Sequence, residues 1–386
     1  MPQVDDLSRC LAALDQDSTL IAVIELSLKH WLVAGIIPGV ERQPLKKLDA
    51  DCDALLRLLE RWREEALKAG RRITRVTVAF EAGRDGFWLA RWLRARGIEA
   101  HVIHPASVAV SREHRRAKTD RLDTELLMRA FLGWLRGERK HCQMSAIPTL
   151  EEEDARRPGR ELNSLAKEKT RITNRMKAAL ARLGVVNFKP TLRNAAARLE
   201  TAATAEGVGV PPNALAELRR DMARLSLIKE QIRAIETARL ERVREAPKQG
   251  PHALVLMLAK IRSIGVGTAD LLVNEVLTRR LRDERAVARY GGLTGAPDES
   301  GSKRREKGLA RAGNARVRRG MIQLAWRFLM FQENSALARW YQARTDNAKG
   351  MRKKMIVALA RKLLIALWRY VRTGLVPDGV VLRAVP

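Results

Sequence analysis

The chain has 386 residues, of which 46% are hydrophobic, and it carries a formal net charge of +29. This composition excludes a disordered chain and predicts a folded protein of two or three domains. So large a positive charge attracts polyanions, and the apolar runs are too short to span a bilayer, so the expected partner is nucleic acid rather than a membrane. Three scattered cysteines exclude a disulfide framework or a zinc site, and few aromatic residues disfavour single-strand binding on stacked rings.

Residues 18–141 alternate between apolar strand patterns and amphipathic helix patterns, which predicts an α/β domain with a mixed sheet. Strands are expected at 19–26, 30–37, 75–80 and 98–105, and helices at 49–70, 85–97 and 118–135.

A polar linker at 143–160 is followed by two long charged helices, expected at about 160–184 and 213–246. In the second helix, apolar residues recur every three or four positions from Leu215 to Ile235, as in a coiled-coil seam. The spacing does not show whether the partner helix belongs to the same chain or to another, so both alternatives stay open. The remainder, 252–386, is expected to be helical with glycine-rich loops.

Four acidic residues lie within or next to apolar strand and helix patterns, where a carboxylate is unusual. Asp120 and Asp123 lie three apart on one helical face that continues inward as an apolar stripe, although alone they would be ordinary helix-start acids. Glu25 interrupts the apolar strand IAVIEL, where a carboxylate is costly unless it is paired or bound to a metal. Glu81 follows directly on the strand expected at 75–80, at its carboxyl end. Together the four predict a Mg²⁺ or Mn²⁺ site at one edge of the sheet, suited to phosphoryl transfer.

A second candidate site lies in DESGSKRREKGLARAGNARVRRG, residues 298–320. Ser300 stands in a Ser-Gly pair, which alone indicates a turn, but the cations that follow could stabilise charge on a phosphate attacked by a serine hydroxyl. Asn314 is expected to cap the next helix. The nucleic-acid contacts predicted here and before the acidic helix are Lys303, Arg304, Arg305, Arg311, Asn314, Arg316, Arg318, Arg319, Arg115, Arg116 and Lys118.

The segment GVGTA, upstream of the serine, lies between two predicted helices in the manner of a helix–hairpin–helix. Its glycines would let backbone N–H groups approach a phosphate at the start of the second helix. The predicted contacts are Gly265, Gly267 and Thr268.

In this order, the motifs resemble the DEDD transposases of bacterial insertion sequences, which are bridge-RNA-guided recombinases. The resemblance covers almost the whole chain through IAVIELSLK, AFEAGRDGFWLARWL, HRRAKTDRLDTELL, GVGTAD, ARYGGLTGAPDESGS and GLARAGNARVRRGMIQLAW. It implies a RuvC-like, RNase H-type domain at 18–141, a helical coiled-coil region at 150–246 that joins protomers, and a mostly helical transposase domain at 252–386. Glu25, Glu81, Asp120 and Asp123 would bind the metal, with glutamate at position 25 where the family usually has aspartate.

The resemblance further implies that Ser300, with Ser302 the weaker candidate, attacks DNA to form a covalent phosphoserine link. Strand exchange and religation would take place in a dimer or tetramer, with a structured RNA choosing the donor and target DNA. Such a protein would be cytoplasmic and nucleoid-associated. The alternatives are a metal-dependent nuclease or Holliday-junction resolvase without a covalent intermediate, and a non-catalytic basic scaffold that binds DNA or RNA.

Overall fold

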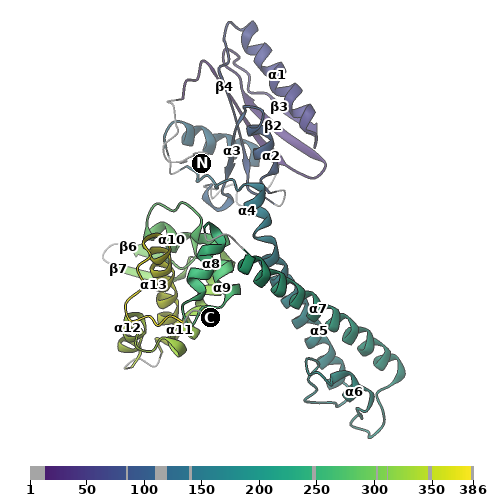
Figure 1. Cartoon of the computed structure of the whole chain (residues 1–386). Helices are drawn as coiled ribbons and strands as arrows, with labels where there is room; N and C mark the ends of the chain where they lie inside the picture. The colour runs from purple at the N-terminus through teal and green to yellow at the C-terminus, as the bar shows by residue number, and fades with distance from the viewer. Residues whose placement is uncertain are drawn as a thin grey trace. The chain divides into compact units, whose positions relative to one another are not determined.

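The computed structural model describes residues 14–83, 86–108, 120–138, 141–245, 249–300, 303–310, 312–346 and 350–383, with the side chains at 106, 297–300 and 303–307 left out. The chain divides into two compact units, Met1–Glu151 and Glu152–Pro386 (Figure 1).

A five-stranded mixed sheet in the order β3-β2-β1-β4-β5 forms the centre of the first unit. The strands are β1 (Thr19–Leu26), β2 (His30–Ile36), β3 (Leu45–Asp49), β4 (Arg75–Glu81) and β5 (Glu99–Ile103). The first three form an antiparallel meander, and β4 and β5 run parallel to β1. The four expected strands are confirmed. The sequence missed β3, LKKLD, because a polar edge strand with two lysines has no apolar alternation.

Helices cover both faces of this sheet. Against one face lie α1 (Cys52–Lys68) and α2 (Trp88–Arg94), whose buried residues share a core with Leu20, Ala22 and Ile24 of β1. The other face is covered by α3 (Asp120–Leu135), which packs on Ile21 and Val23. The even and odd residues of β1 therefore serve separate cores, as the pleat of a strand requires. A short 3₁₀ turn, η1 (Pro105–Ser107), follows β5.

The second unit begins with a helical hairpin, which we call the arm. After α4 (Leu150–Asp154), at the boundary between the units, come α5 (Arg157–Ala181), α6 (Ala195–Glu200) and α7 (Pro212–Glu245). Figure 1 shows α5 and α7 running side by side. Leu218 and Leu225 of α7 share a core with Met176 and Leu180 of α5. At these seam positions the partner helix therefore comes from the same chain.

The rest of the second unit packs helices around one apolar core. Its elements are α8 (Pro251–Ala259), α9 (Val266–Leu272), the π-helical turn η2 (Val273–Leu277), α10 (Glu284–Tyr290), β6 (Gly295–Ser300), β7 (Lys303–Leu309), α11 (Ala315–Phe331), α12 (Ala336–Thr345) and α13 (Arg352–Thr373). The expected helices are present, but the sequence missed the β6–β7 hairpin. The strand segments GAPDES and KRREKGL are polar throughout, so they carry no apolar period to mark them as strands.

Candidate functional site

Glu25 and Glu81 lie beside each other on neighbouring parallel strands. Ile24 of β1 is paired with Phe80 of β4, so the next position on each strand brings the two glutamates to the same level. Both continue the odd-numbered series that faces α3, and both are half-buried. The register therefore places two carboxylates on one face of the sheet, at the carboxyl ends of two central strands.

The start of α3 points toward the same edge of the sheet. Arg136 follows the C-terminal end of α3. With the side-chain amide of Gln16 turned so that its oxygen faces Arg136, Nη2 of Arg136 donates to this oxygen at 3.1 Å. Gln16 precedes β1, so α3 runs antiparallel to β1 and its first turn, with Asp120 and Asp123, lies toward the carboxyl edge. Asp123 is half-buried, as its inward direction predicted, whereas Asp120 is exposed.

This edge of the sheet supplies carboxylate oxygens, the donors that Mg²⁺ and Mn²⁺ prefer. Among the residues that the structure describes, however, no three His, Cys, Asp or Glu side chains are grouped tightly enough to hold a metal ion. The topology thus brings the four predicted ligands to one edge and one face without gathering them into a closed cluster. The predicted contacts Arg115, Arg116 and Lys118 lie outside the described residues.

A partly buried ionic cluster that the sequence did not reveal lies under α3. Glu99 on β5 accepts hydrogen bonds from Arg75 Nε at 2.6 Å and Nη2 at 2.9 Å, and it lies 2.7 Å from Nε2 of His101. Burial would raise the pKa of Glu99, but the hydrogen bonds from His101 and Arg75 outweigh it and lower the pKa to about 2. The His101 ring packs against Phe131 and Trp134 of α3. The cluster thereby fixes the helix that carries the two aspartates.

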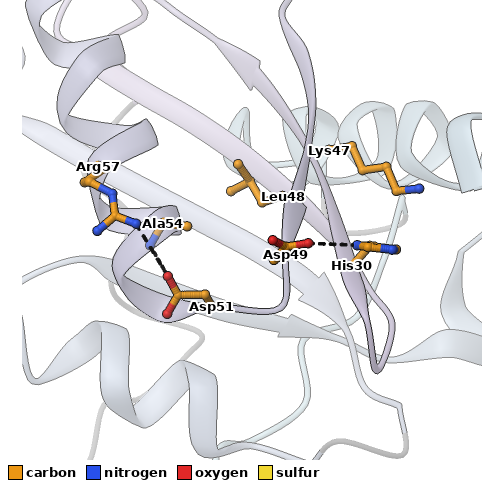
Figure 2. Close-up of a pocket in the computed structure, with 7 residues that line it drawn as sticks. All are labelled: His30, Lys47, Leu48, Asp49, Asp51, Ala54 and Arg57. Carbon is orange, nitrogen blue, oxygen red and sulfur yellow. Dashed lines mark hydrogen bonds and ion pairs between the residues drawn. The ribbon is translucent and has the colours of Figure 1, made fainter.

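A shallow hollow lies on the β2–β3 side of the sheet, near the start of α1. Figure 2 shows His30 pointing toward Asp49, with Nδ1 and Oδ1 3.2 Å apart, and Arg57 reaching toward Asp51, 3.6 Å away. Acids and bases are mixed in its lining, and none of the four predicted ligands is among the lining residues. The hollow therefore contributes none of the predicted metal ligands, although His30 and Asp49 lie at the same end of the sheet as the carboxyl end of β1.

Ser300 ends β6 at the tip of the β6–β7 hairpin, directly opposite Lys303. The sequence predicted a turn at the Ser-Gly pair but not the strand that Ser300 ends. The same register sets Arg304 and Arg305 opposite the acids Glu299 and Asp298. The backbone register thus sets each of these two positions opposite an acidic position of the other strand. Ser302 and Arg311 lie outside the described residues.

Asn314 anchors the hairpin's exit to the fold. Its Oδ1 accepts from the backbone N–H groups of Arg316 at 3.0 Å and Val317 at 3.3 Å, which confirms the predicted cap of α11. Its Nδ2 donates to Glu275 Oε2 at 2.9 Å. Both ends of the amide are therefore engaged within the chain, and the contact to nucleic acid predicted for Asn314 stays a prediction.

Glu275 itself is only 4% exposed and lies in the π-helical turn η2. Arg160 of the arm places its Nε 3.5 Å from Glu275 Oε1, and Arg156 Nε donates to the carbonyl of Asn274 at 2.9 Å. The arm and the start of α11 thus meet at one buried carboxylate. Nothing in the sequence marks this glutamate, because it stands within a helical pattern and all of its side-chain partners are distant in sequence.

The other predicted contacts divide into exposed and structural side chains. Arg316 and Arg319 are exposed on α11, whereas Arg318 donates to the carbonyl of Ala312 at 3.2 Å. The segment GVGTA follows the short connection from α8 and forms the start of α9, with Gly265 at the N-cap position, as expected of a helix–hairpin–helix. A Cβ on Gly267 would lie 3.0 Å from Nη1 of Arg239, so packing also favours glycine there. Thr268 Oγ1 accepts from Arg327 Nη2 at 2.7 Å.

In the part of the chain that the structure describes, no helix is long and apolar enough to cross a bilayer. Residues 256–342 match the family described as "Transposase IS116/IS110/IS902 family". The chain is also 40% identical over 371 residues to a protein of Sinorhizobium fredii (strain NBRC 101917 / NGR234) named "Putative transposase y4rJ". That match covers 93% of this chain and 93% of the relative. The matched family segment contains the β6–β7 hairpin and α11.

Proposed function

Because the chain belongs to the IS116/IS110/IS902 family of transposases, we propose that it cleaves and rejoins DNA through a covalent link to Ser300. As a transposase it is a DNA-processing enzyme, and DNA is its partner. The observation that carries the proposal is the position of Ser300. It lies at the tip of a hairpin inside the family segment, opposite Lys303 and next to a strand rich in arginine.

The covalent step exchanges one ester bond for another. Ser300 Oγ forms a bond to the phosphorus, the bond from phosphorus to the bridging sugar oxygen breaks, and the hydroxyl proton passes by way of a base to the departing oxygen. Attack by the hydroxyl of another strand reverses the step and rejoins the DNA. Lys303 and the neighbouring arginines would stabilise the charge that accumulates on the phosphate oxygens.

We assign the carboxylate edge of the first unit to a RuvC-like metal site. The antiparallel meander followed by two parallel strands, with acids at the carboxyl ends of β1 and β4, supports this assignment. Glu25, Glu81, Asp120 and Asp123 would hold Mg²⁺ or Mn²⁺, which when bound neutralises phosphate charge and orients its oxygens. Because glutamate at position 25 reaches one methylene further than aspartate, we expect a metal preference that differs from that of an aspartate site.

The proposal extends to partners. A structured RNA would select donor and target, and protomers would associate as dimers or tetramers with the arm contributing to the contact. Support for the RNA comes from the resemblance of the motifs and from the net charge of +29, which favours a polyanionic partner. The arm supports association through the length of α7, 34 residues.

A denaturing gel with labelled DNA tests the serine. The wild-type protein, given element ends and the cognate RNA, should yield a labelled DNA–protein adduct that survives denaturation and disappears in Ser300→Ala. Ser302→Ala is the matched control and should keep the adduct. Asp120→Ala, Asp123→Ala and EDTA should each abolish cleavage. Cleaved DNA with free ends in Ser300→Ala would instead favour the metal-dependent nuclease.

A further inference from the structure

One face of α11 is exposed along the whole helix. It carries Arg316, Arg319, Gln323, Trp326 and Met330, which follow one another at spacings of three and four residues and therefore share one side of the helix. The helix has arginine at positions 316, 318, 319 and 327 and contains no acidic residue. The face thus begins with cations and ends with apolar side chains, and no carboxylate of its own helix neutralises it.

Trp326 is the unusual member of this face. It is 45% exposed, and Met330 beside it is 68% exposed. Among the residues that the structure describes, other tryptophans have a cation over the ring: Arg96 lies 3.8 Å from Trp92, Lys362 4.9 Å from Trp340, and Arg372 4.7 Å from Trp368. Among the described residues, no ring or cation is stacked on Trp326. A large aromatic surface is therefore left open.

The rim of the face is held in place by α9. Arg327 Nη2 donates to Thr268 Oγ1 at 2.7 Å. A Cβ on Gly320 would lie 2.6 Å from Leu271 Cδ2, so α9 and α11 are in close contact. These contacts fix α11, and the exposed face is presented on a rigid support rather than on a loop.

We propose that this face binds single-stranded nucleic acid, with phosphates at Arg316 and Arg319 and one unpaired base stacked on Trp326. Arginine side chains contact phosphates, and the open face of a tryptophan suits a base that is not already stacked in a duplex. Arg319 and Trp326 are about 10 Å apart along the helix axis, roughly three base steps of a stacked strand. The absence of acids on α11 favours a polyanion over a protein surface as the occupant.

This inference rests on the proposed function only in that a transposase handles nucleic-acid strands; it does not require Ser300 to be the nucleophile. It also changes the expectation drawn from the low aromatic content. One exposed tryptophan among arginines provides a platform for one base even in a chain poor in aromatic residues. The strand is either DNA or the proposed guide RNA, which present the same chemistry to this face.

The first test compares binding of labelled 12-nucleotide single strands of DNA and RNA, and of the matching DNA duplex, to the full-length protein at fixed salt. Trp326→Ala should weaken binding of the preferred single strand roughly 5- to 150-fold, the effect of losing one stacked base, with a much smaller change for the duplex. Trp326→Phe should retain most of the affinity. Trp88→Ala is the matched control, because Trp88 is 43% exposed in the other unit, and it should bind as the wild type does.

A second measurement needs no substitution at all. A single strand with 5-bromouracil, irradiated on the wild-type protein, should crosslink to the peptide that contains Trp326. Unchanged single-strand affinity in Trp326→Ala, an equal loss for duplex and single strand, or an equal loss in Trp88→Ala would overturn the proposal. So would a changed molar mass of Trp326→Ala in light scattering, which would make this face a protein interface. A wild-type protein that crosslinks at Trp326 but forms no serine adduct would refute the proposed function and leave this inference standing.

Discussion

Replacing Asn314 separates two contributions that one side chain makes to the second unit. Its oxygen caps α11 and its nitrogen donates to the buried Glu275. Asn314→Ser keeps a capping oxygen but is too short to donate to Glu275, whereas Asn314→Ala removes both interactions. Asn314→Asp keeps the cap and places a second carboxylate against Glu275.

The expected losses follow from these contacts. Removing the cap costs about 1 kcal/mol, and leaving a buried acceptor without its donor costs about 1–3 kcal/mol. We therefore expect Asn314→Ser to lower the free energy of unfolding by about 1–3 kcal/mol and Asn314→Ala by about 2–4 kcal/mol. Asn314→Asp should be destabilised at neutral pH and regain stability as the pH falls, because one of the two facing carboxyls then becomes protonated.

The two compact units can unfold separately, so the assay must report on the second unit. Calorimetry that resolves its transition, together with hydrogen exchange of the α11 amides, meets this need. Asp283→Ala is the control in the same unit, because Asp283 caps α10 through Ala286 N–H at 2.7 Å. Besides this cap, the substitution removes an exposed ion pair with Arg282, which contributes little to stability. Wild-type stability in Asn314→Ser, with Asn314→Ala no worse than Asp283→Ala, would refute a stabilising role for the bond to Glu275.

Three further predictions follow from other parts of the chain. The pKa of Glu99 is lowered to about 2 from an ordinary 4.5, so the ionised Glu99 stabilises the first unit fully above about pH 4.5 and loses this contribution as the pH falls toward 2. The stability of Glu99→Gln should therefore fall less between pH 4.5 and 2 than that of the wild type. Arg175→Leu should destabilise the arm by about 1–3 kcal/mol in urea, because it removes the bidentate partner of Asp221, which is 2% exposed. Replacing Arg304 and Arg305 with glutamine should reduce the salt dependence of DNA binding by about one unit for each lost phosphate contact.

Each of these three has a result that would contradict it. An acid limb in Glu99→Gln identical to the wild type would show that the ion pair contributes no pH-dependent stability. An Arg175→Leu arm as stable as the wild type would mean that Arg224, whose Nη1 lies 3.1 Å from Asp221 Oδ1, suffices alone. An unchanged salt slope would mean that Arg304 and Arg305 are neutralised by the acids across the hairpin.

Apolar patterns located most of the fold, because strands such as β1 and β4 are continuous apolar runs buried on both faces and helices such as α1 bury one amphipathic face. They failed at β3 and at the β6–β7 hairpin, whose polar residues leave no period to read. Interactions between residues close in the sequence could also be predicted. Asn314 caps α11 as expected, since a cap depends on residues only two or three positions away.

Contacts in the candidate sites between residues far apart in the sequence could not be predicted from local patterns. The sequence correctly singled out Glu25 and Glu81 as strand carboxylates, but only the register of β1 and β4 shows that they are neighbours. The interactions of Glu275 and of Glu99 involve residues of other helices and strands, so no local sequence pattern predicts them. The metal ligands and the nucleophile remain predictions about chemistry rather than about fold.

The central claim is that Ser300 carries the cleaved DNA, and peptide mass spectrometry of the trapped adduct tests it most directly. After nuclease and protease digestion of the wild-type adduct, the residual nucleotide should be attached to the Ser300 side chain through a phosphodiester. Attachment to Ser302 or to another residue, or cleavage that leaves only free DNA ends and unmodified Ser300, would contradict the claim.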